Sequence, residues 1–224
     1  MKKLVIYGTG QIAEIAHHYF SLYSNFEVVA FTDNEKYLTN KKFLNLQVVE
    51  FENIEKLYSP ENFYMFVAVS YKGLNSLRKK LYLAAKNKGY RLASFIFPDS
   101  HLINNIEIGE NCLILENQTL QPFSKIGDNV FVWGNCVLGH HTKILDHCWL
   151  TSGTSIGGNS IINEKTFLGL NSTIGHFVEI GKENFIGANV LVTKNTQPKS
   201  VYIQKDTEKF KLNSDKFLII SKMV

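Results

Sequence analysis

Histidine is the residue type in this chain best suited to acid–base chemistry. Four of the seven histidines fall in one stretch, residues 102–192: His140, His141, His147 and His176. An imidazole gives and takes protons near neutral pH, so a well-placed ring can act as a general base. A histidine at a variable surface position has no such role by default, so the surrounding pattern must decide.

Cysteine offers a second set of candidate groups, Cys112, Cys136 and Cys148. Their spacings of 24 and 12 residues match no metal-ligand signature. We interpret them as small apolar fillers inside a reduced protein, and we expect no metal site.

A six-residue repeat organises the stretch that holds these residues. Every sixth residue from Ile108 to Val192 is Leu, Ile or Val, fifteen positions in succession. The fourth residue after each aliphatic is small or β-branched almost throughout, and glycine often follows the aliphatic directly. A period of six fits neither an α-helix nor a flat sheet, and it predicts a β-solenoid of short strands and turns.

Residues 1 to about 98 follow a different pattern, in which strands alternate with helices. We expect strands at 3–7, 27–33, 63–69 and 93–97, and helices at 12–20 and 75–88. This alternation predicts a parallel α/β sheet. The run Phe97-Pro98-Asp99-Ser100 breaks it, so the domain boundary is expected there.

The first predicted strand ends in a glycine turn, Gly8-Thr9-Gly10-Gln11-Ile12-Ala13, and the second ends in Asp33. Such a turn lets a pyrophosphate approach the backbone and the free N–H groups of the next helix, while the acid accepts from a ribose or a base. The loop from Ser70 to Gly73 should lie on the same sheet edge. Lys72 and Arg78 could reach phosphates there, or they could simply be solvated charges. A tight strand–helix turn that binds no ligand would show the same glycine pattern.

The repeat resembles that of the hexapeptide-repeat acyltransferases: aliphatic, Gly, two variable residues, a small residue, one variable residue. This resemblance implies a left-handed parallel β-helix with three hexads per coil, so His140 and His176 would share one column two coils apart. With the α/β domain in front, residues 1 to about 203 resemble sugar acyltransferases of the sialic acid O-acetyltransferase and bacillosamine N-acetyltransferase type. The expected fold is a Rossmann-like α/β domain (1–98), an all-β left-handed β-helix (99–203) and a tail (204–224).

The family resemblance implies acetyl transfer from acetyl-CoA to an amino group of a UDP- or dTDP-linked amino-deoxysugar. His140 matches the catalytic base of the family, with direct attack on the thioester and no acyl-enzyme. His141 stands where the family commonly has an acid, and we assign it to the catalytic pair. Asp146 or Glu116 are alternative acids. Where the family carries a second histidine this chain has Trp149, so His147 or a backbone N–H could stabilise the oxyanion.

The resemblance also assigns binding residues. Those for the nucleotide-linked sugar are Gly8, Gly10, Gln11 (where the family often has His), Asp33, Asn34, Ser70, Tyr71 and Lys72. Those for acetyl-CoA are Gly158, Leu170, Gly187, Ala188 and Lys194. Because the family binds acetyl-CoA in a groove between neighbouring solenoids, a homotrimer is expected.

Three alternatives stay open at this point. The first is O-acetylation of a sugar, as in the sialic acid enzymes. The second is a non-catalytic trimeric scaffold or sugar-binding module, since Gln204-Lys205-Asp206-Thr207 replaces the family's Gly-Asn-Pro-Ala beside the cofactor. The third is a nicotinamide oxidoreductase that uses the glycine turn. The rest of the tail, 208–224, is expected to be a helix or one more strand.

The composition limits the partners. The formal net charge of +4 comes from scattered lysines, and no arginine-rich patch with interleaved aromatics indicates nucleic acid. Apolar runs such as Leu4 to Tyr7 are far too short to span a bilayer. Met1-Lys2-Lys3 runs directly into a strand and makes a poor signal peptide, so we expect a cytoplasmic protein.

Overall fold

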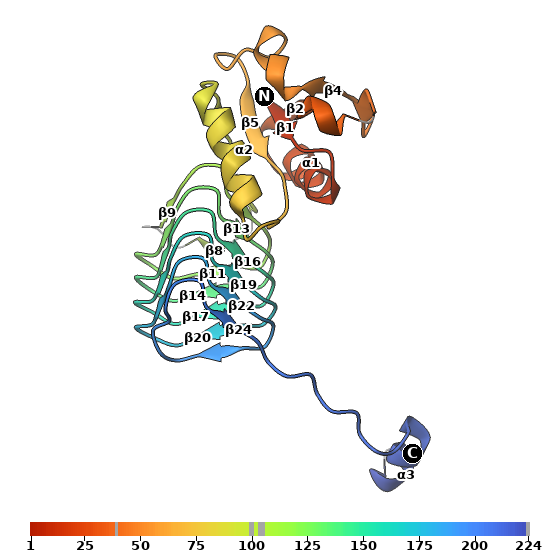
Figure 1. Ribbon diagram of the computed structural model, residues 1–224, viewed down its shortest axis with the longest axis vertical. Coiled ribbons are helices and arrows are strands. Elements are labelled where there is room, and N and C mark those ends of the chain that lie inside the picture. The colour runs from red at the N-terminus through yellow and green to blue at the C-terminus, as the bar shows by residue number, and fades with distance from the viewer. Residues whose placement is uncertain (39, 99–100, 103–105, 223–224) are drawn as a thin grey trace.

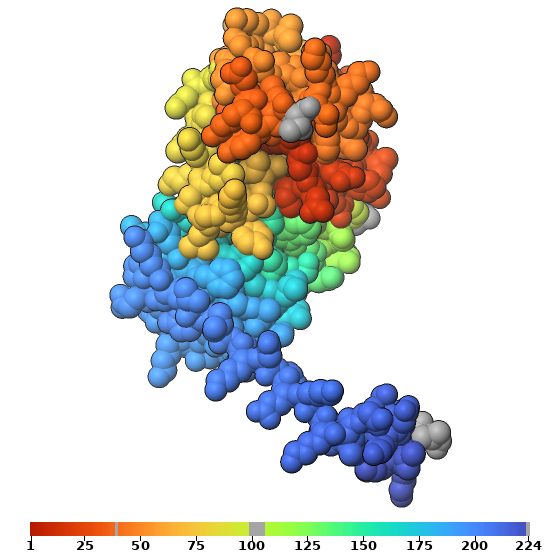
Figure 2. Space-filling view, turned by 45° about the vertical axis from the view of Figure 1, so that its right-hand side comes forward, coloured from red at the N-terminus to blue at the C-terminus, as the bar shows by residue number. Residues whose placement is uncertain are grey.

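The computed structural model describes residues 1–38, 40–98, 101–102 and 106–222. Asp99 and Ser100, part of the predicted domain break, lie outside the described residues. A small α/β unit stands on one side of the first coils of a β-solenoid, and a C-terminal arm leaves the far end of the coils (Figure 1). Figure 2 shows the two units in direct contact and the arm projecting from the body.

The α/β unit is one mostly parallel sheet with helices. Its elements are β1 (Lys2–Tyr7), α1 (Gln11–Tyr23), β2 (Phe26–Asp33), η1 (Glu35–Tyr37), β3 (Lys42–Phe43), β4 (Leu46–Glu50), η2 (Phe51–Lys56), β5 (Tyr64–Val67), α2 (Ser76–Asn87) and β6 (Arg91–Leu92). The strand order is β3-β4-β2-β1-β5-β6, and only the β3–β4 pair is antiparallel. The expected α/β sheet with helices near 12–20 and 75–88 is confirmed.

Burial explains these elements. Residues Leu4 to Tyr7 of β1 are fully buried, as expected for a central strand covered on both faces. Helix α1 turns Ala13, Ala16 and Phe20 toward the sheet at helical spacing. The strand predicted at 93–97 is present as β7 (Phe95–Ile96), but its assignment to the α/β sheet is wrong, because β6 ends that sheet and β7 pairs with the solenoid strand β10.

The solenoid has three parallel sheets, one for each hexad of the coil. One sheet contains β7, β10 (Leu113–Ile114), β13 (Phe131–Val132), β16 (Trp149–Leu150), β19 (Phe167–Leu168), β22 (Phe185–Ile186) and β24 (Val201–Tyr202). The second contains β8 (His101–Leu102), β11 (Thr119–Leu120), β14 (Val137–Leu138), β17 (Ser155–Ile156), β20 (Thr173–Ile174) and β23 (Leu191–Val192). The third contains β9 (Glu107–Ile108), β12 (Lys125–Ile126), β15 (Lys143–Ile144), β18 (Ile161–Ile162) and β21 (Glu179–Ile180).

The repeat predicted from the sequence builds this core. The aliphatic column fills the interior, joined by the small-residue column with its three cysteines, which are free and buried as predicted. Burial raises the pKa of each thiol to about 12, which leaves it protonated and inert. The residue before each small residue has a left-handed backbone, often as asparagine, which tolerates positive φ and lets the chain turn the corner; Asn111, Asn129 and Asn171 are examples.

The three faces of the solenoid differ in their outward side chains. The aromatic face carries Phe95, Leu113, Phe131, Trp149 and Phe167, which pack into one core with α1 and the first sheet. The charged face presents Glu107, Lys125, Lys143, Ile161 and Glu179. The uncharged face presents Thr119, Val137, Ser155, Thr173 and Leu191. The α/β unit therefore covers the aromatic face and leaves the other two open.

Three corners join these faces, and each is named here for the feature that lies on it. The groove corner follows the aromatic face and comprises 115–118 and the equivalent positions of each later coil. The histidine corner follows the uncharged face and comprises 121–124 and its equivalents. The α2 corner follows the charged face and comprises 127–130 and its equivalents. In a triangular coil the histidine corner is the one opposite the face that the α/β unit covers.

The C-terminal arm ends in α3 (Ser214–Ile220), whose N-cap Asn213 accepts a hydrogen bond from the backbone N–H of Lys216. Of the two forms expected for 208–224, the helix is the one observed. Within the described part of the chain, no helix has both the length and the apolar content that a membrane crossing requires.

Candidate functional site

Two exposed histidines meet on the histidine corner. The Nδ1 atoms of His140 and His141 are 3.1 Å apart, so one hydrogen atom bridges them. The backbone N–H of His140 donates to Oε1 of Gln121, one coil earlier, at 2.9 Å. The ring of Phe123 packs on His141 with centroids 4.8 Å apart. The pair is thus held from three sides while it stays open to solvent.

The next coil leaves room for the catalytic candidate. A Cβ added to Gly158 would lie 2.8 Å from Nε2 of His140, so the imidazole rests in the space that this glycine leaves empty. Each strand of this face pairs in register with the equivalent strand of the next coil, which places His140, Gly158, His176 and Lys194 in one column. The predicted shared column of His140 and His176 is confirmed. The backbone hydrogen bond from His140 also adds Gln121 to the site, a residue that the hexad pattern does not mark.

The alternative acids do not reach this pair. Asp146 lies on the α2 corner, where its Oδ1 accepts from the backbone N–H of Asp128 at 2.8 Å. Glu116 lies on the groove corner, where its Oε2 accepts from the hydroxyl of Tyr19 at 2.8 Å. Within the described residues, His141 is therefore the side chain that holds the His140 ring at Nδ1.

His147 does not belong to this site, contrary to the expectation that it points outward and could serve as an oxyanion donor. It is 5% exposed on the α2 corner, with its ring 5.4 Å from that of Tyr82 and its Nδ1 2.9 Å from Nδ2 of Asn129. Burial, with the nearby Lys79 and Arg78, lowers the pKa of His147 to about 4. It is a neutral side chain of the domain joint.

Arg78 also differs from both expectations, since it neither reaches a phosphate loop nor lies in solvent. It is fully buried between α2 and the coils, where its guanidinium donates to the backbone carbonyls of Asn129, His147 and Cys148 and to Oδ1 of Asn75. It stacks 4.3 Å from the ring of Phe131. Burial lowers the pKa of Arg78 to about 9. Arg78 therefore ties the two domains together.

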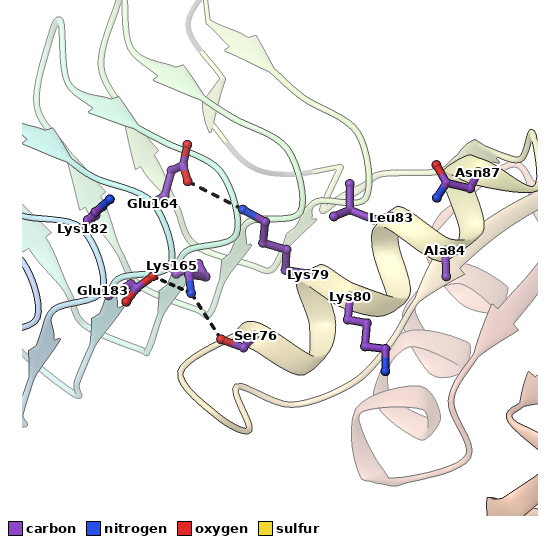
Figure 3. Close-up of a pocket in the computed structure, with 10 residues that line it drawn as sticks. All are labelled: Ser76, Lys79, Lys80, Leu83, Ala84, Asn87, Glu164, Lys165, Lys182 and Glu183. Carbon is purple, nitrogen blue, oxygen red and sulfur yellow. Dashed lines mark hydrogen bonds and ion pairs between the residues drawn. The ribbon is translucent and has the colours of Figure 1, made fainter.

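Ion pairs extend this joint toward solvent. Figure 3 shows a cleft between α2 and the α2 corner, in which Lys79 pairs with Glu164 at 3.8 Å and Lys165 pairs with Glu183 at 2.6 Å. Nζ of Lys165 also donates to Oγ of Ser76 at 3.3 Å. The solenoid and the first domain thus form one body, with α2 fixed over this corner.

Most of the predicted cofactor residues line one groove on the groove corner. It measures about 1110 Å³ and contains Leu170, Gly187 and Ala188 together with residues 204–207 and Tyr71. The segment that departs from the family motif thus borders the groove. The other two cofactor residues, Gly158 and Lys194, stand on the histidine corner, across the uncharged face.

The predicted nucleotide residues gather at the carboxyl ends of β1, β2 and β5. Gly8 has φ of 129°, and a Cβ there would lie 2.7 Å from the carbonyl oxygen of Ala68, so only glycine fits this turn. Gly10 caps α1 without a side-chain hydrogen bond, which leaves the first N–H groups of the helix available. Oδ2 of Asp33 accepts from Thr9 at 2.9 Å, which ties the two loops.

The remaining predicted nucleotide residues are divided. Asn34 follows Asp33 and accepts from the hydroxyl of Tyr7 at 3.0 Å, while Gln11 is exposed at the start of α1. Ser70 and Lys72 are exposed on the same edge. Tyr71 turns instead to the solenoid, with its ring 4.7 Å from that of Phe167. In the described residues, no three His, Cys, Asp or Glu side chains are grouped so as to hold a metal ion.

Comparisons with known proteins agree with this fold. A family model described as the GMPPB C-terminal domain matches residues 96–208. The acetyltransferase domain of PglB from Neisseria gonorrhoeae FA1090 superposes with a TM-score of 0.80 at 21% identity, covering 90% of this chain and 96% of that one. PerB from Caulobacter crescentus, solved with CoA and GDP-perosamine, has a TM-score of 0.77 at 23% identity, covering 89% of this chain and 92% of that one.

A third solved structure, WeeI from Acinetobacter baumannii AYE, has a TM-score of 0.75 at 19% identity and covers 88% of this chain and 94% of that one. A search of curated protein sequences gives no match. At these identities the likeness to solved structures establishes the fold.

Proposed function

We propose that this chain, which belongs to the GMPPB C-terminal domain family, transfers an acetyl group from acetyl-CoA to an amino group of a nucleotide-linked amino-deoxysugar. The observation that carries the proposal is the His140–His141 pair on the uncovered corner of a solenoid that is similar to acetyltransferases. UDP and dTDP remain the expected nucleotides, and the complex of PerB with GDP-perosamine adds GDP.

In the proposed mechanism the neutral amine attacks the thioester carbonyl carbon directly. The C–N bond forms, the C–S bond breaks, and the nitrogen loses a proton to Nε2 of His140 while the CoA thiolate leaves and is protonated in turn. For this role, the hydrogen that bridges His140 and His141 must be bonded to Nδ1 of His140. Nε2 of His140 is then unprotonated and can accept the proton from the amine. General-base catalysis of this kind contributes about 10²- to 10⁴-fold.

The separation of the two halves of the site supports a homotrimer. Within one chain the histidine corner and the cofactor groove are on different corners, with the uncharged face between them. An open sheet face without charges suits contact with another copy. If the threefold axis runs parallel to the coils, the histidine corner of one copy meets the groove corner of the next at the same coil level.

The first domain is proposed to hold the nucleotide in a Rossmann-like manner. Gly8, Gly10 and the free N–H groups of α1 would receive the pyrophosphate, and Asp33 the ribose or base, with Gln11, Asn34, Ser70 and Lys72 around them. The division at residues 98 and 203, the left-handed turn of the coils and a cytoplasmic location belong to the same proposal. Strand β7 precedes residue 98 and already pairs in the solenoid, so the first coil begins slightly before this division.

Substitution His140→Ala tests the proposal. We expect turnover to fall about 10²- to 10⁴-fold while the trimer and the melting temperature stay unchanged. His176→Ala is the matched control, because it removes an exposed ring from the same column and should retain activity. Full activity in His140→Ala would exclude the mechanism.

The substrate can be identified with a thermal-shift panel of UDP-, dTDP-, GDP- and CMP-sugars, each with and without acetyl-CoA. We expect one nucleotide sugar and acetyl-CoA each to raise the melting temperature. A chain that responds to no acyl-CoA would be a scaffold or a sugar-binding module instead.

A further inference from the structure

A pocket lies between α1 and the groove corner, apart from the histidine pair and the cofactor groove. It measures about 520 Å³, and its walls include Glu14, His18, Tyr19, Glu116, Trp133 and Asn135. Helix α1 supplies one wall and three successive coils supply the other.

The charge of this pocket is unusual for a chain with a net charge of +4. Its walls contain two carboxylates, Glu14 and Glu116, and neither a lysine nor an arginine. The cleft beside α2, in contrast, has four lysines and two glutamates. An anionic ligand such as a phosphate would therefore be repelled from this pocket, and a cation would be attracted.

Glu116 is the group best placed to receive that cation. Its Oε2 accepts from the hydroxyl of Tyr19 at 2.8 Å, and Oε1 has no hydrogen bond or ion pair within the described residues. Burial and the nearby Glu116 carboxylate raise the pKa of Tyr19 to about 12, so the hydroxyl keeps its proton and holds the carboxylate in place. A half-buried, oriented carboxylate with one free oxygen is suited to an ammonium group.

We propose that this pocket between α1 and the groove corner, here named the amine pocket, binds the amino group of the nucleotide-linked sugar. The acceptor of the acetyl group is then an amine and not a hydroxyl. The inference rests on the proposed function. Glu116 holds the ammonium form, and the rings of Tyr19 and Trp133 offer further stabilisation to a cation and an apolar surface to the sugar. The neutral amine that attacks is the minor form in equilibrium with this ammonium.

The position of the pocket links the two ligands of the proposed reaction. Glu14 follows Gly10 by four residues, so the pocket begins about 6 Å along α1 from the proposed pyrophosphate site. A sugar attached to that pyrophosphate would need to extend only about this far along α1 to enter the pocket. Gly134 and Asn135 are on the same coil as His140, so in the proposed trimer the base of the neighbouring copy faces the pocket at this level. The cofactor groove continues along the same corner and begins one coil further on, at Thr151.

Substitution Glu116→Gln tests the pocket in the full-length protein. One probe is a dTDP-linked amino-deoxysugar, and the other is the same nucleotide sugar with a hydroxyl in place of the amine. If the thermal-shift panel selects another nucleotide, the same pair of sugars is prepared with that nucleotide. We expect Glu116→Gln to raise KM for the amino sugar about 10- to 100-fold, with KM for acetyl-CoA unchanged. Glu164→Gln, a carboxylate at the α2 joint, is the matched control and should leave these constants unchanged.

Gly134→Ala is a second variant, which keeps the charge. Its Cβ would lie 3.7 Å from Oε1 of Glu116, an ordinary contact that the fold accepts, but it narrows the approach to the free oxygen. We expect the same rise in KM for the amino sugar at an unchanged melting temperature. Unaltered KM in both variants would overturn the inference.

A binding measurement separates this inference from the proposed function. By calorimetry, the wild-type protein should bind the amino sugar about 10-fold or more tightly than the hydroxyl sugar, and Glu116→Gln should bind both alike. This difference is measurable even if no acetyl transfer occurs, in which case the proposed function alone fails. Equal affinity of the wild-type protein for the two sugars would overturn the amine pocket while leaving acetyl transfer open.

Discussion

His141 and His147 occupy the same place in two successive hexads, yet they have opposite environments. Each lies directly before a buried small residue, Thr142 or Cys148, and each has a left-handed backbone at its own corner, with φ of 59° and 64°. His141 is exposed beside His140, whereas His147 is 5% exposed beneath α2. The repeat provides equivalent positions, and the docking of the first domain decides which of them can meet a substrate.

The two corners also differ in how their polar groups are satisfied. On the α2 corner, Asn129 and His147 bond each other and the guanidinium of Arg78, so these groups find their partners within the fold, although Nε of Arg78 is buried without one. On the histidine corner the His140–His141 pair leaves ring atoms free for an external partner. An internal network contributes stability and an exposed pair is available for chemistry, so substitutions on the two corners should have separable effects.

Substitution of Arg78 should give the largest loss of stability. Arg78→Ala leaves the buried carbonyls of Asn129, His147 and Cys148 without their donor and opens a cavity against Phe131. We expect the free energy of unfolding to fall by roughly 3–5 kcal/mol, measured by chemical denaturation. Lys80→Ala, an exposed residue two positions on, should change it by less than about 0.5 kcal/mol.

If Arg78→Ala were as stable as Lys80→Ala, the α2 corner would not be a structural joint. If His140→Ala lost as much stability as Arg78→Ala, the separation between the two corners would fail.

The pH dependence of stability should distinguish the two corners next. The pKa of His147 is lowered in the folded state to about 4, from an ordinary value of 6.5, by burial and by Lys79, Arg78 and Lys165, with Asp128 opposing. The unfolded chain therefore binds the proton more tightly. The contribution of neutral His147 is fully present above about pH 6.5 and is lost as the pH falls toward 4, by up to about 3 kcal/mol.

His147→Gln cannot take up this proton, so its unfolding free energy should change less between pH 6.5 and 4 than that of the wild-type protein. His141→Gln is the matched variant on the exposed corner and should keep the full wild-type slope. Equal slopes in the wild-type protein and His147→Gln would show that His147 does not stay neutral in the fold.

The sequence predicted the features that repeat and missed those that depend on docking. The aliphatic column, the buried cysteines and the His140–His176 column follow from a local period, because each coil places its hexads in the same way. Arg78 and His147 were read by residue type as exposed or outward-pointing. Their burial depends on α2 packing across coils that are distant in the sequence, which no local pattern records.

The same distinction holds for the candidate site. The family motif identified His140, and the roles of the binding residues remain predictions. The short range of a hexad could not reveal that Glu116 faces α1, because its partner Tyr19 is 97 residues away. The local pattern also could not show that β7 pairs with the solenoid and not with the α/β sheet. Phe95 and Ile96 would suit an apolar strand in either of the two sheets.

The glycines of the histidine corner offer the finest test, because two of them differ in what an added side chain would meet. A methyl group at Gly158 would lie 2.8–3.1 Å from three ring atoms of His140, so the imidazole must move. At Gly175, on the next coil, the nearest atom would be 3.4 Å away, an ordinary contact. Neither glycine has a positive φ, so alanine adds no backbone strain at either position.

We therefore expect Gly158→Ala to lower kcat about 10- to 100-fold and Gly175→Ala to leave it near the wild-type value, with equal melting temperatures. If Gly158 instead acts mainly as a contact for acetyl-CoA, KM for acetyl-CoA would rise and kcat would hold. Both variants add one methyl group to the same corner. A difference in kcat between them therefore reports the position of the His140 ring and not a general effect of alanine on the folding of the coil.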